Sequence, residues 1–376
     1  MKNTYPKLKI MTIIGTRPEI IKLSRIIPFM DKHFDHIVVF TSQSYSYELS
    51  DVFFKELGLR KPNYILNVKA ETVGQQIANV LSQTERIMIS QKPDAIFILG
   101  DTNSSLSSIV AKRIKIPIFH YEAGNRSFDW DVPEEINRRI VDHISNFNLA
   151  YTEHARRNLI NEGIPIDKIF VIGSPLAEVL QYYRKNILDS KILNELKLKR
   201  EKYFVVSTHR EENVDNKYRL EQLFKSFNDI AKVYSIPIIV TLHPRTKNKL
   251  NAIANARINP LVKFFKPFGF FDYVKLQQNA CCVLSDSGTI QEESAMLKFR
   301  AIQIRVSTER PEAFDTGSII VTGIHVSSIL NALDLVISKE NDPNNLGIPQ
   351  NYQDKNVSLK IVKLIMGFAS IRKCEI

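Results

Sequence analysis

The feature that most constrains this chain is a repeated pairing of a short apolar run with a following helical stretch. In the first half, runs typical of buried strands cover residues 9–14, 36–41, 95–99 and 116–120. In the second half, similar runs cover residues 203–207, 238–241 and 281–284. Strands separated by helices predict a parallel sheet with helices on both faces. The sequence therefore predicts an α/β protein built from two doubly wound domains.

The length of 376 residues supports two domains, each with its own core. We expect an N-terminal domain over residues 1–174 and a C-terminal domain over residues 175–350. Residues 357–371 interleave charges with apolar side chains, which predicts a helix that needs a partner surface. We expect the segment 351–376 to cross back to the first domain. Polar residues follow the strands in both halves, so we also expect the domains to face a ligand cleft.

The composition indicates an ordinary globular protein and argues against one that binds nucleic acid. Hydrophobic residues make up 44% and charged residues 24% of the chain, as in ordinary globular proteins. The net charge is +11, but the basic residues are dispersed and not interleaved with aromatic ones. This pattern favours a solvated basic surface, or one that attracts an anionic small substrate, over binding of nucleic acid.

The cysteines and the N-terminus indicate a cytoplasmic protein. Two of the three cysteines are adjacent, a spacing that suits neither a metal site nor a disulfide framework. The apolar run Ile10–Ile14 is too short for the hydrophobic core of a signal peptide. No stretch of the sequence approaches the length of a membrane span. We therefore expect a location in a reducing cytosol.

A charged segment from residue 120 to residue 143 directly follows an apolar run. Open α/β sheets bind ligands at the carboxyl ends of their strands, which is where this segment is expected. Asp131 and Glu134 have the spacing of a capping box, and Pro133 suits the first turn of a helix. Glu134 with Arg138 and Glu135 with Arg139 are i,i+4 pairs, which also fits a plain surface helix.

The position of two upstream residues favours function over a plain surface helix. Glu122 and Arg126 are expected on a glycine-containing loop just before this helix. Functional residues concentrate on such loops when a rigid scaffold positions them.

A second candidate site lies in the other half of the chain. Ser287, Gly288 and Thr289 open a predicted helix directly after a strand. Free backbone N–H groups and the helix dipole make such a position an anion site. The alternative is an ordinary serine N-cap. Arginines expected near the strand ends offer guanidinium contacts to phosphate; these are Arg17, Arg210 and Arg310.

Two familiar nucleotide motifs are missing. The dinucleotide fingerprint G-x-G-x-x-G does not follow the first strand, and no Walker sequence occurs. We therefore expect no tightly bound NAD and no ATP hydrolysis. We also expect no other cofactor and no metal ion.

Seven ordered motifs resemble the non-hydrolysing UDP-N-acetylglucosamine 2-epimerase family. They extend from about residue 9 to residue 313, and as a series they are far more specific than any one alone. In this chain they are Gly15–Glu19, Gly100–Thr102, His120–Gly124, Pro133–Arg138, His209–Asn213, Asp286–Glu293 and Thr308–Ala313. The resemblance implies two Rossmann-like domains of the glycosyltransferase B type, a UDP-sugar substrate and a homodimer.

The resemblance also implies a reaction and its residues. Members of the family eliminate UDP in the anti sense to give a 2-acetamidoglucal, then add UDP back with the C2 proton on the other face. Carboxylates near the sugar and cations near the diphosphate suit this chemistry. The residues that match the family's catalytic positions are Asp101, Glu122, Glu134, Arg138 and His209.

The nucleotide site is implied in the same way. The residues expected to hold the diphosphate are Arg17, Ser287, Gly288 and Thr289, and Glu293 is expected to hold the ribose. Arg310 is expected on the diphosphate or the sugar. The other residues assigned to nucleotide binding are Arg210, His243 and Phe270, the last two on a looser local match. A structural role is the alternative for His209 and His243.

Two departures from the family pattern bear on substrate and regulation. Ser44 stands where many members have a histidine linked to allosteric binding of a second UDP-N-acetylglucosamine, which puts that activation in doubt. Asn125 and the short spacing before Pro133 resemble a capsule-type branch. That branch converts UDP-2-acetamido-2,6-dideoxy-L-talose to UDP-N-acetyl-L-fucosamine.

Three classes of function are weighed. The first is the epimerase. The second is a glycosyltransferase with a UDP-sugar donor, which explains a phosphate site but not the carboxylates. The third is a nucleotide-sugar sensor, which gains nothing from clustered like charges. The sequence leaves open the physiological sugar, the assignment of base and acid, allosteric activation and the oligomeric state.

Overall fold

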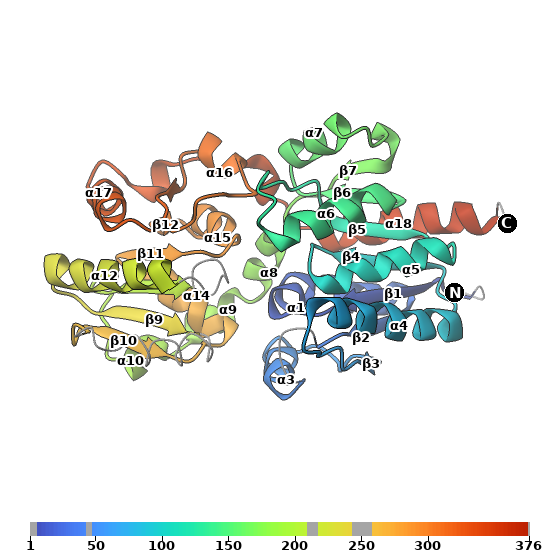
Figure 1. Ribbon diagram of the computed structural model, residues 1–376, viewed down its shortest axis with the longest axis horizontal. Coiled ribbons are helices and arrows are strands. Elements are labelled where there is room, and N and C mark those ends of the chain that lie inside the picture. Colours follow the sequence, from blue (N-terminus) through green and yellow to red (C-terminus); the bar gives the residue numbers. More distant parts are fainter. Residues whose placement is uncertain (1–5, 43–46, 209–216, 243–257, 375–376) are drawn as a thin grey trace. The chain divides into compact units, whose positions relative to one another are not determined.

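The computed structural model describes residues 6–42, 47–208, 217–242 and 258–374. The chain divides into two compact units, and each contains its own parallel sheet (Figure 1). The first unit comprises Met1–Gln181 and Gln350–Ile376, and the second comprises Tyr182–Pro349. Two parallel α/β units confirm the fold class predicted from the alternating strand and helix patterns.

The sheet of the first unit contains seven strands among the described residues, and every pairing is parallel. Their order is β3-β2-β1-β4-β5-β6-β7, so the direction of winding reverses between β1 and β4. The strands are β1 (Lys9–Ile14), β2 (Asp35–Phe40), β3 (Tyr64–Ile65), β4 (Ala95–Leu99), β5 (Ile118–Ala123), β6 (Phe147–Ala150) and β7 (Ile169–Val171).

The predicted strands of the first half are confirmed, with one shift that matters for the site. β1 and β4 have the predicted bounds, and β2 is displaced by one residue. The fourth predicted strand, 116–120, instead covers Ile118–Ala123. It starts later because Pro117 has no backbone N–H to donate. It ends later because Tyr121 still pairs with β4 and Ala123 with β6. Glu122 therefore lies in the strand and not on the predicted loop.

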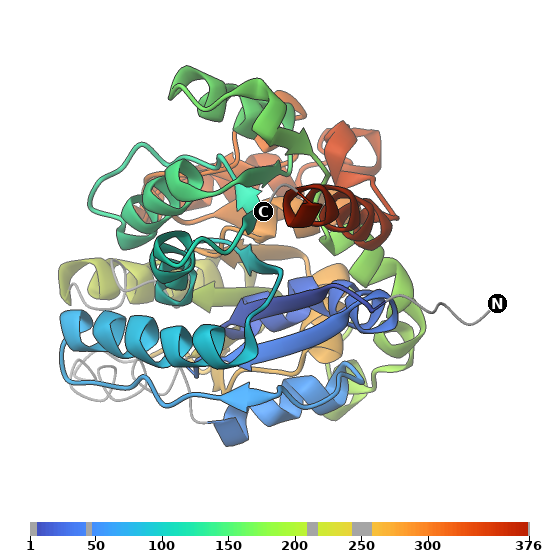
Figure 2. The ribbon, with the colours of Figure 1, turned by 90° about the vertical axis from the view of Figure 1, so that its right-hand side faces the viewer.

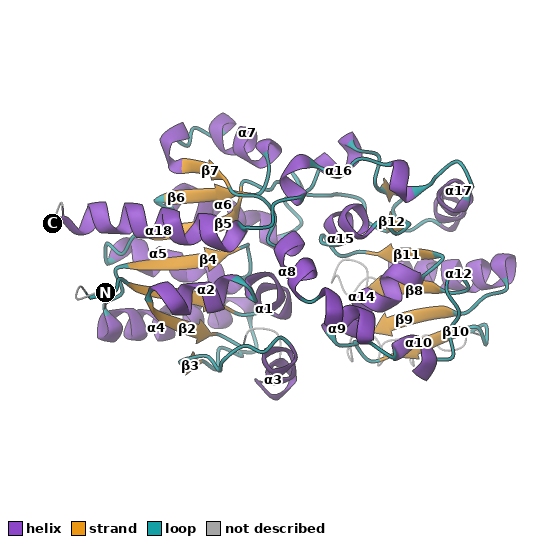
Figure 3. Ribbon diagram, turned by 180° about the vertical axis from the view of Figure 1, so that it is seen from behind, coloured by secondary structure: helices purple, strands orange, loops and turns teal. Residues whose placement is uncertain are grey.

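Helices flank this sheet (Figure 3). Alternate residues of the central strands, such as Met11, Ile13, Ile96 and Ile98, join one apolar core beneath them. The helices of the described first unit include α1 (Arg17–Leu23), α2 (Ile26–His33), α3 (Tyr47–Glu56), α4 (Val73–Gln91), α5 (Ser107–Arg113), α6 (Pro133–Ile144), α7 (Glu153–Asn161) and α8 (Leu176–Tyr182), with 3₁₀ turns η1 (Asn103–Leu106), η2 (Ile166–Lys168) and η4 (Gln350–Tyr352).

The last helix, α18 (Val357–Cys374), belongs to the first unit although it follows the second in sequence. It packs against α2, and the ring of Phe368 lies 4.5 Å from that of Phe147 in β6. Figure 2 shows α18 in dark red alongside the first unit. Lys360 near its start bonds to the carbonyl oxygen of Ile172 at 3.1 Å, which adds a polar contact to the apolar packing.

The second unit repeats the plan with six parallel strands among the described residues. The order is β10-β9-β8-β11-β12-β13, again reversing at a central pair, β8 and β11. The strands are β8 (Phe204–Thr208), β9 (Ile238–Leu242), β10 (Val262–Phe265), β11 (Cys282–Ser285), β12 (Ala301–Gln303) and β13 (Ile320–Val321). The three predicted strands are confirmed within one residue at each end.

The side chains of this sheet alternate between two cores. Phe204 and Val206 join the core on one face, whereas Tyr203 and Val205 join the core on the other. The helices described in this unit include α9 (Arg184–Asp189), α10 (Ile192–Glu195), α12 (Lys217–Tyr234), α14 (Phe270–Asn279), α15 (Ile290–Leu297), α16 (Glu312–Asp315) and α17 (Val326–Ile337), with a 3₁₀ turn η3 (Pro343–Asn345). Among all described helices, none is both long and apolar enough to cross a bilayer.

Candidate functional site

The predicted carboxylates of the first unit lie at the carboxyl ends of neighbouring strands. β1 and β4 are the pair at which the strand order reverses, and β5 lies on the other side of β4. Asp101 follows β4 by two residues, and Glu122 lies near the end of β5. Ligands of open α/β sheets bind at this kind of reversal point. The topology therefore brings two predicted catalytic residues to the position that the fold uses for ligands.

Glu122 is directed by an irregularity in β5. The pairing of β5 with β6 shifts between Tyr121 and Ala123, so Glu122 is left out of the ladder. Its φ angle is 71°, in the left-handed region that costs a non-glycine residue on the order of 1–3 kcal/mol. Bulges next to active sites redirect a side chain in this way. The backbone strain at Glu122 is what one expects where the direction of the carboxylate matters more than stability.

Two groups hold the Glu122 carboxylate from one side. The ammonium of Lys22, on α1, lies 2.6 Å from Oε2, and the hydroxyl of Tyr151 donates to the same oxygen at 3.1 Å. Lys22 is only 8% exposed and Glu122 7%. A buried ammonium at this distance favours the ionised carboxylate strongly. Sequence reasoning missed both partners, although Lys22 lies three residues after the Gly15–Glu19 motif.

Asp101 is joined to α6 through Arg138. Nη2 of the Arg138 guanidinium donates to Oδ2 of Asp101. Nη1 of the same guanidinium donates to Oε2 of Glu135 at 2.9 Å. The side chain of Asn137 bonds to the backbone carbonyl of Asp101 at 2.9 Å. The strand end and the helix are thus held together at this point. The prediction that Asp101 and Arg138 share a site is consistent with this ion pair.

The start of α6 differs from the prediction. The N-cap is Val132, which offers no side-chain cap, so Asp131 and Glu134 form no capping box. The backbone N–H of Asp131 instead donates to Oδ1 of Asp129 in a turn. Pro133 occupies the first turn, as predicted. Glu134 is half-buried, and the predicted pair of Glu135 with Arg139 is confirmed at 3.0 Å.

A fourth carboxyl group, Glu19, lies close to this cluster and was not predicted as a site residue. Its Oε2 accepts the backbone N–H groups of Gly15 and Thr16 at 3.0 and 2.7 Å. Thr102, next to Asp101, donates to its Oε1 at 3.4 Å. Burial raises the pKa of Glu19 to about 7, although these hydrogen bonds oppose the shift. The spacing Thr16-x-x-Glu19 before a helix is a capping-box signal that identifies this contact.

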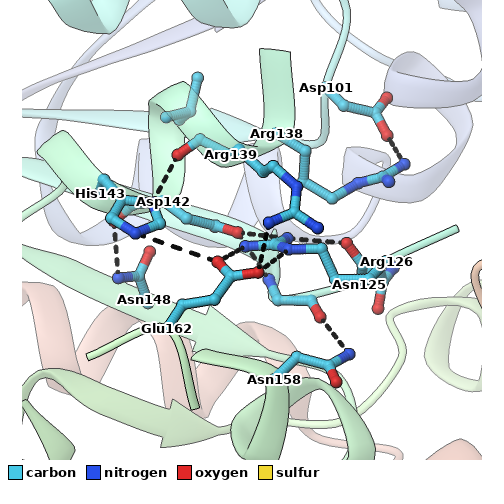
Figure 4. A network of polar contacts seen from close by, with 12 residues as sticks. Asp101, Asn125, Arg126, Arg138, Arg139, Asp142, His143, Asn148, Asn158 and Glu162 are labelled. Carbon is cyan, nitrogen blue, oxygen red and sulfur yellow. Dashed lines mark hydrogen bonds and ion pairs between the residues drawn. The ribbon is translucent and has the colours of Figure 1, made fainter. Parts of the chain in front are cut away.

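Behind α6, a buried network of alternating charges ties the site to the scaffold (Figure 4). Arg126 is 1% exposed and contacts Asp142 at 2.7 Å and Glu162 at 2.6 Å. Arg139 joins Glu162 at 2.8 Å and Glu135 at 3.0 Å. Arg126 was expected on a functional loop, but its buried partners indicate a structural role. Removing one member of such a network leaves an uncompensated buried charge, which costs about 3–5 kcal/mol.

In the second unit, Ser287, Gly288 and Thr289 lie between β11 and α15, as predicted. Thr289, and not Ser287, is the N-cap, and its side chain makes no cap hydrogen bond, so the helix does not begin with an ordinary serine N-cap. The Ser287 hydroxyl instead accepts the backbone N–H of Thr289 at 3.3 Å. The hydroxyls of Ser287 and Thr289 lie 3.0 Å apart. Gly288 between them is half-exposed, as are both neighbours, and it has no side chain to cover its backbone. Backbone N–H groups at the start of a helix favour an anion.

Other predicted nucleotide ligands lie around this helix start. Arg310 forms an ion pair with the buried Glu292 on α15, with 3.0 Å between Nη1 and Oε1. Glu293 is half-buried, and its Oε2 accepts a hydrogen bond from Gln277 at 2.6 Å. Phe270 is buried at the first position of α14. The unit therefore brings residues 287–289, Glu293 and Arg310 to one helix, while sequence reasoning missed Glu292.

The remaining predicted residues have separate positions. Arg17 is the first residue of α1 in the first unit, and its guanidinium carbon lies 5.3 Å from the centre of the Phe53 ring. His209, Arg210, His243 and Ser44 lie outside the described residues. Within the described ranges, no three His, Cys, Asp or Glu side chains group in a way that holds a metal ion.

The fold is an α/β fold of the glycosyltransferase B type, and the two sets of polar residues form a candidate acid–base site and a candidate anion site. Comparison with known proteins identifies the family. A family model described as UDP-N-acetylglucosamine 2-epimerase matches residues 30–366. The UDP-N-acetylglucosamine 2-epimerase of Methanocaldococcus jannaschii is 39% identical over 89% of this chain and 93% of its own length.

Solved structures give the same result. That of UDP-N-acetylglucosamine 2-epimerase from Rickettsia bellii has a TM-score of 0.91 and 45% identity, covering 97% of this chain and 98% of that one. That of the M. jannaschii UDP-GlcNAc 2-epimerase with UDP-GlcNAc and UDP has a TM-score of 0.89 and 36% identity, covering 96% and 99%. The chain therefore belongs to the UDP-N-acetylglucosamine 2-epimerase family. It is an isomerase, as the motifs predicted, and the glycosyltransferase alternative is set aside.

Proposed function

We propose that this enzyme interconverts the C2 epimers of a UDP-N-acetylhexosamine by anti elimination of UDP and its re-addition. A base removes the C2 proton, the C–H electron pair forms the C1=C2 bond, and the C1–O pair leaves with UDP. Re-addition then delivers a proton to the opposite face of C2. The observation that carries the proposal is the meeting of Asp101 and Glu122, each with its own cation, at the strand ends of the first unit.

The ion pairs support roles for these carboxylates. Lys22 beside Glu122 and Arg138 beside Asp101 place a cation next to each carboxylate. Glu134, half-buried in the first turn of α6, is the third carboxylate in the proposed site. His209 completes the catalytic set on the strength of its motif. One carboxylate accepts the C2 proton, and another, on the opposite face, returns it.

The leaving diphosphate requires positive charge and N–H donors. Ser287, Gly288 and Thr289 supply the helix start, and Arg17 and Arg310 supply guanidinium groups. The residues proposed for the rest of the nucleotide are Glu293, on the ribose hydroxyls, with Arg210, His243 and Phe270 as further contacts.

The proposed ligands come from both halves of the chain. We therefore propose that residues 1–174 and 175–350 act as two domains on one ligand, with 351–376 returning to the first. Such a division of labour lets the first domain supply the acid–base groups and the second hold the nucleotide.

The physiological sugar is either UDP-N-acetylglucosamine, which gives UDP-N-acetylmannosamine, or UDP-2-acetamido-2,6-dideoxy-L-talose. The relatives named above favour the first, and the Asn125 segment favours the second. We further propose that the enzyme works in the cytoplasm as a homodimer and does not bind nucleic acid.

Solvent deuterium tests the reaction. The enzyme is incubated in deuterium oxide with each of the two UDP-sugars, without an acceptor, and C2 is followed by proton NMR. We expect both epimers of the true substrate to acquire deuterium at C2, because the proton-carrying carboxyl groups exchange with solvent.

Other outcomes contradict the proposal. Release of UDP with C2 still fully protiated indicates transfer or hydrolysis. No deuteration of either sugar contradicts epimerisation of these substrates. The control is Glu122→Gln, which we expect to exchange C2 far more slowly than the wild type.

A further inference from the structure

His120 is a fully buried histidine on β5 that the proposed reaction does not use. Its Nε2 lies 2.8 Å from the carbonyl oxygen of Gly100, and its Nδ1 lies 2.8 Å from Oδ1 of Asp142 on α6. Both His120 and Asp142 are at most 1% exposed. A carbonyl oxygen only accepts hydrogen bonds, so Nε2 carries a proton and donates it to Gly100.

Asp142 extends this contact to a second strand end. Its other oxygen, Oδ2, accepts the backbone N–H of Gly124 at 3.1 Å and contacts Arg126 at 2.7 Å. Burial alone would raise the pKa of Asp142, but its bonds and charge interactions with His120 and Arg126 hold that pKa below its usual range. Asp142 is thus a buried carboxylate with a donor on each oxygen.

The two backbone groups that this pair holds flank the proposed catalytic carboxylates. Gly100 directly precedes Asp101, and Gly124 follows Glu122 by two residues. Both glycines have positive φ angles, 71° and 82°. A Cβ on Gly124 would lie 2.3 Å from the carbonyl oxygen of Ala155, so no other residue fits there without displacement. The end of β5 that carries Glu122 is therefore held by the bond from Gly124 to Asp142 and by the close approach of Gly124 to α7.

We infer that His120 and Asp142 form a positioning pair, which sets the placement of Asp101 relative to Glu122 by holding the Gly100 carbonyl and the Gly124 amide. The inference rests on the proposed roles of those two carboxylates. Neither His120 nor Asp142 exchanges a proton with the substrate. Misplacement of a reacting group by about 1 Å costs on the order of 10²-fold in rate. The pair therefore acts on turnover and not on binding of UDP.

Two substitutions separate the two contacts of His120. The amide nitrogen of asparagine takes the place of Nδ1, so His120→Asn keeps the contact to Asp142 and loses the one to Gly100. The amide nitrogen of glutamine takes the place of Nε2, so His120→Gln keeps the contact to Gly100. We expect kcat of His120→Asn to fall about 10²-fold with KM and UDP affinity within about threefold of wild type. We expect His120→Gln to retain at least about ten times the kcat of His120→Asn.

The matched control is His33→Asn. His33 ends α2 two residues before β2 begins, at the amino ends of the strands of the same sheet. Its ring lies 4.9 Å from that of Phe29, tilted by 45°. We expect its kcat to match that of the wild type. Wild-type kcat per folded molecule in both His120 variants would overturn the inference, because it would leave the histidine a purely structural role. Equal losses of kcat in both variants would overturn the special role of the Gly100 contact.

Hydrogen exchange gives a readout that does not depend on activity. In the unmodified enzyme, we expect the Gly124 amide to exchange as slowly as the amides within β5, because it donates a hydrogen bond to the buried carboxylate of Asp142. Fast exchange at Gly124 would overturn the inference even if no variant folds. If Glu122→Gln proves fully active while Gly124 stays protected, the proposed catalytic role fails and the positioning contact remains.

Discussion

The ammonium of Lys22 lies 2.6 Å from the carboxylate of Glu122, which follows it by 100 residues in the chain. Both side chains are buried, and the hydroxyl of Tyr151 meets the same carboxylate oxygen. α1 carries Lys22 near its end and Arg17 at its start. One short helix therefore connects a cation of the carboxylate cluster with a cation proposed for the leaving diphosphate.

Replacement of Lys22 by methionine tests the importance of this pair. Lys22→Met keeps the apolar stem and removes the charge that favours ionised Glu122. We expect kcat to fall about 10²–10³-fold, the scale seen when one electrostatic partner is removed from an active site. Lys32→Met, an exposed lysine on α2, serves as control and should match the wild type. Undiminished turnover of folded Lys22→Met in steady-state assays would contradict the proposed role.

Glu122→Gln and Glu134→Gln separate proton transfer from binding. Each change is nearly isosteric and removes the acid–base group, so we expect turnover to fall on the order of 10²–10⁴-fold. UDP affinity, measured by calorimetry, should stay close to that of the wild type, because neither glutamate is among the proposed diphosphate ligands. If Glu134→Gln loses UDP binding and also melts early, Glu134 has a structural role at the start of α6.

Glu19 predicts a pH-dependent stability. Its pKa is about 7 in the folded chain, mainly because of burial, against 4.5 for an ordinary glutamate carboxyl. The folded state therefore holds this proton more tightly than the unfolded state. The resulting stabilisation is fully present below pH 4.5 and is lost as the pH rises through about 7. The difference of about 2.5 pH units corresponds to roughly 3 kcal/mol.

Glu19→Gln removes this titration while glutamine still suits the capping position. We expect the melting temperature of the variant, relative to wild type, to rise steadily between about pH 5 and pH 8. The measurement is a set of thermal unfolding curves for both proteins at matched ionic strength. A constant difference across this range would show that Glu19 has an ordinary pKa in the folded protein.

The sequence predicted the sheets and the strand-end residues better than the contacts among them. Strand bounds were within one residue for most of the predicted strands because buried parallel strands are continuous apolar runs. The strands β3, β6, β7, β10, β12 and β13 were not predicted, because each has only two to four residues and carries too little pattern to be recognised. Asp101 and Glu122 were assigned as catalytic residues by the match to the family's motifs, and both lie where polar residues follow or end an apolar run.

Contacts between distant segments have no local signal. Lys22 lies in an amphipathic helix, where a lysine is ordinarily a surface residue. Tyr151 directly follows the apolar strand β6, so the sequence suggests only an ordinary core residue there. The bulge at Glu122 arises from the different registers of β5 with β4 and with β6, which no single strand sequence contains. The capping box predicted at α6 was wrong. The backbone N–H of Asp131 donates to Asp129, so it is not available to the side chain of Glu134.

An elimination mechanism also predicts the fate of the oxygen that bridges C1 and phosphorus. When heavy oxygen bridges C1 and phosphorus in the substrate, loss of UDP breaks the C1–O bond and leaves that oxygen on the terminal phosphate of UDP. Rotation of this phosphate makes its oxygens equivalent before UDP adds back. We therefore expect the label to move into non-bridging positions of the recovered UDP-sugar, visible as isotope shifts in phosphorus NMR. A hydride route through C3 leaves the bridge intact.

The rate of scrambling should fall with that of C2 deuteration in Glu122→Gln, because both require the same proton removal. C2 deuteration with no scrambling and no trace of free UDP would rule out elimination in this enzyme.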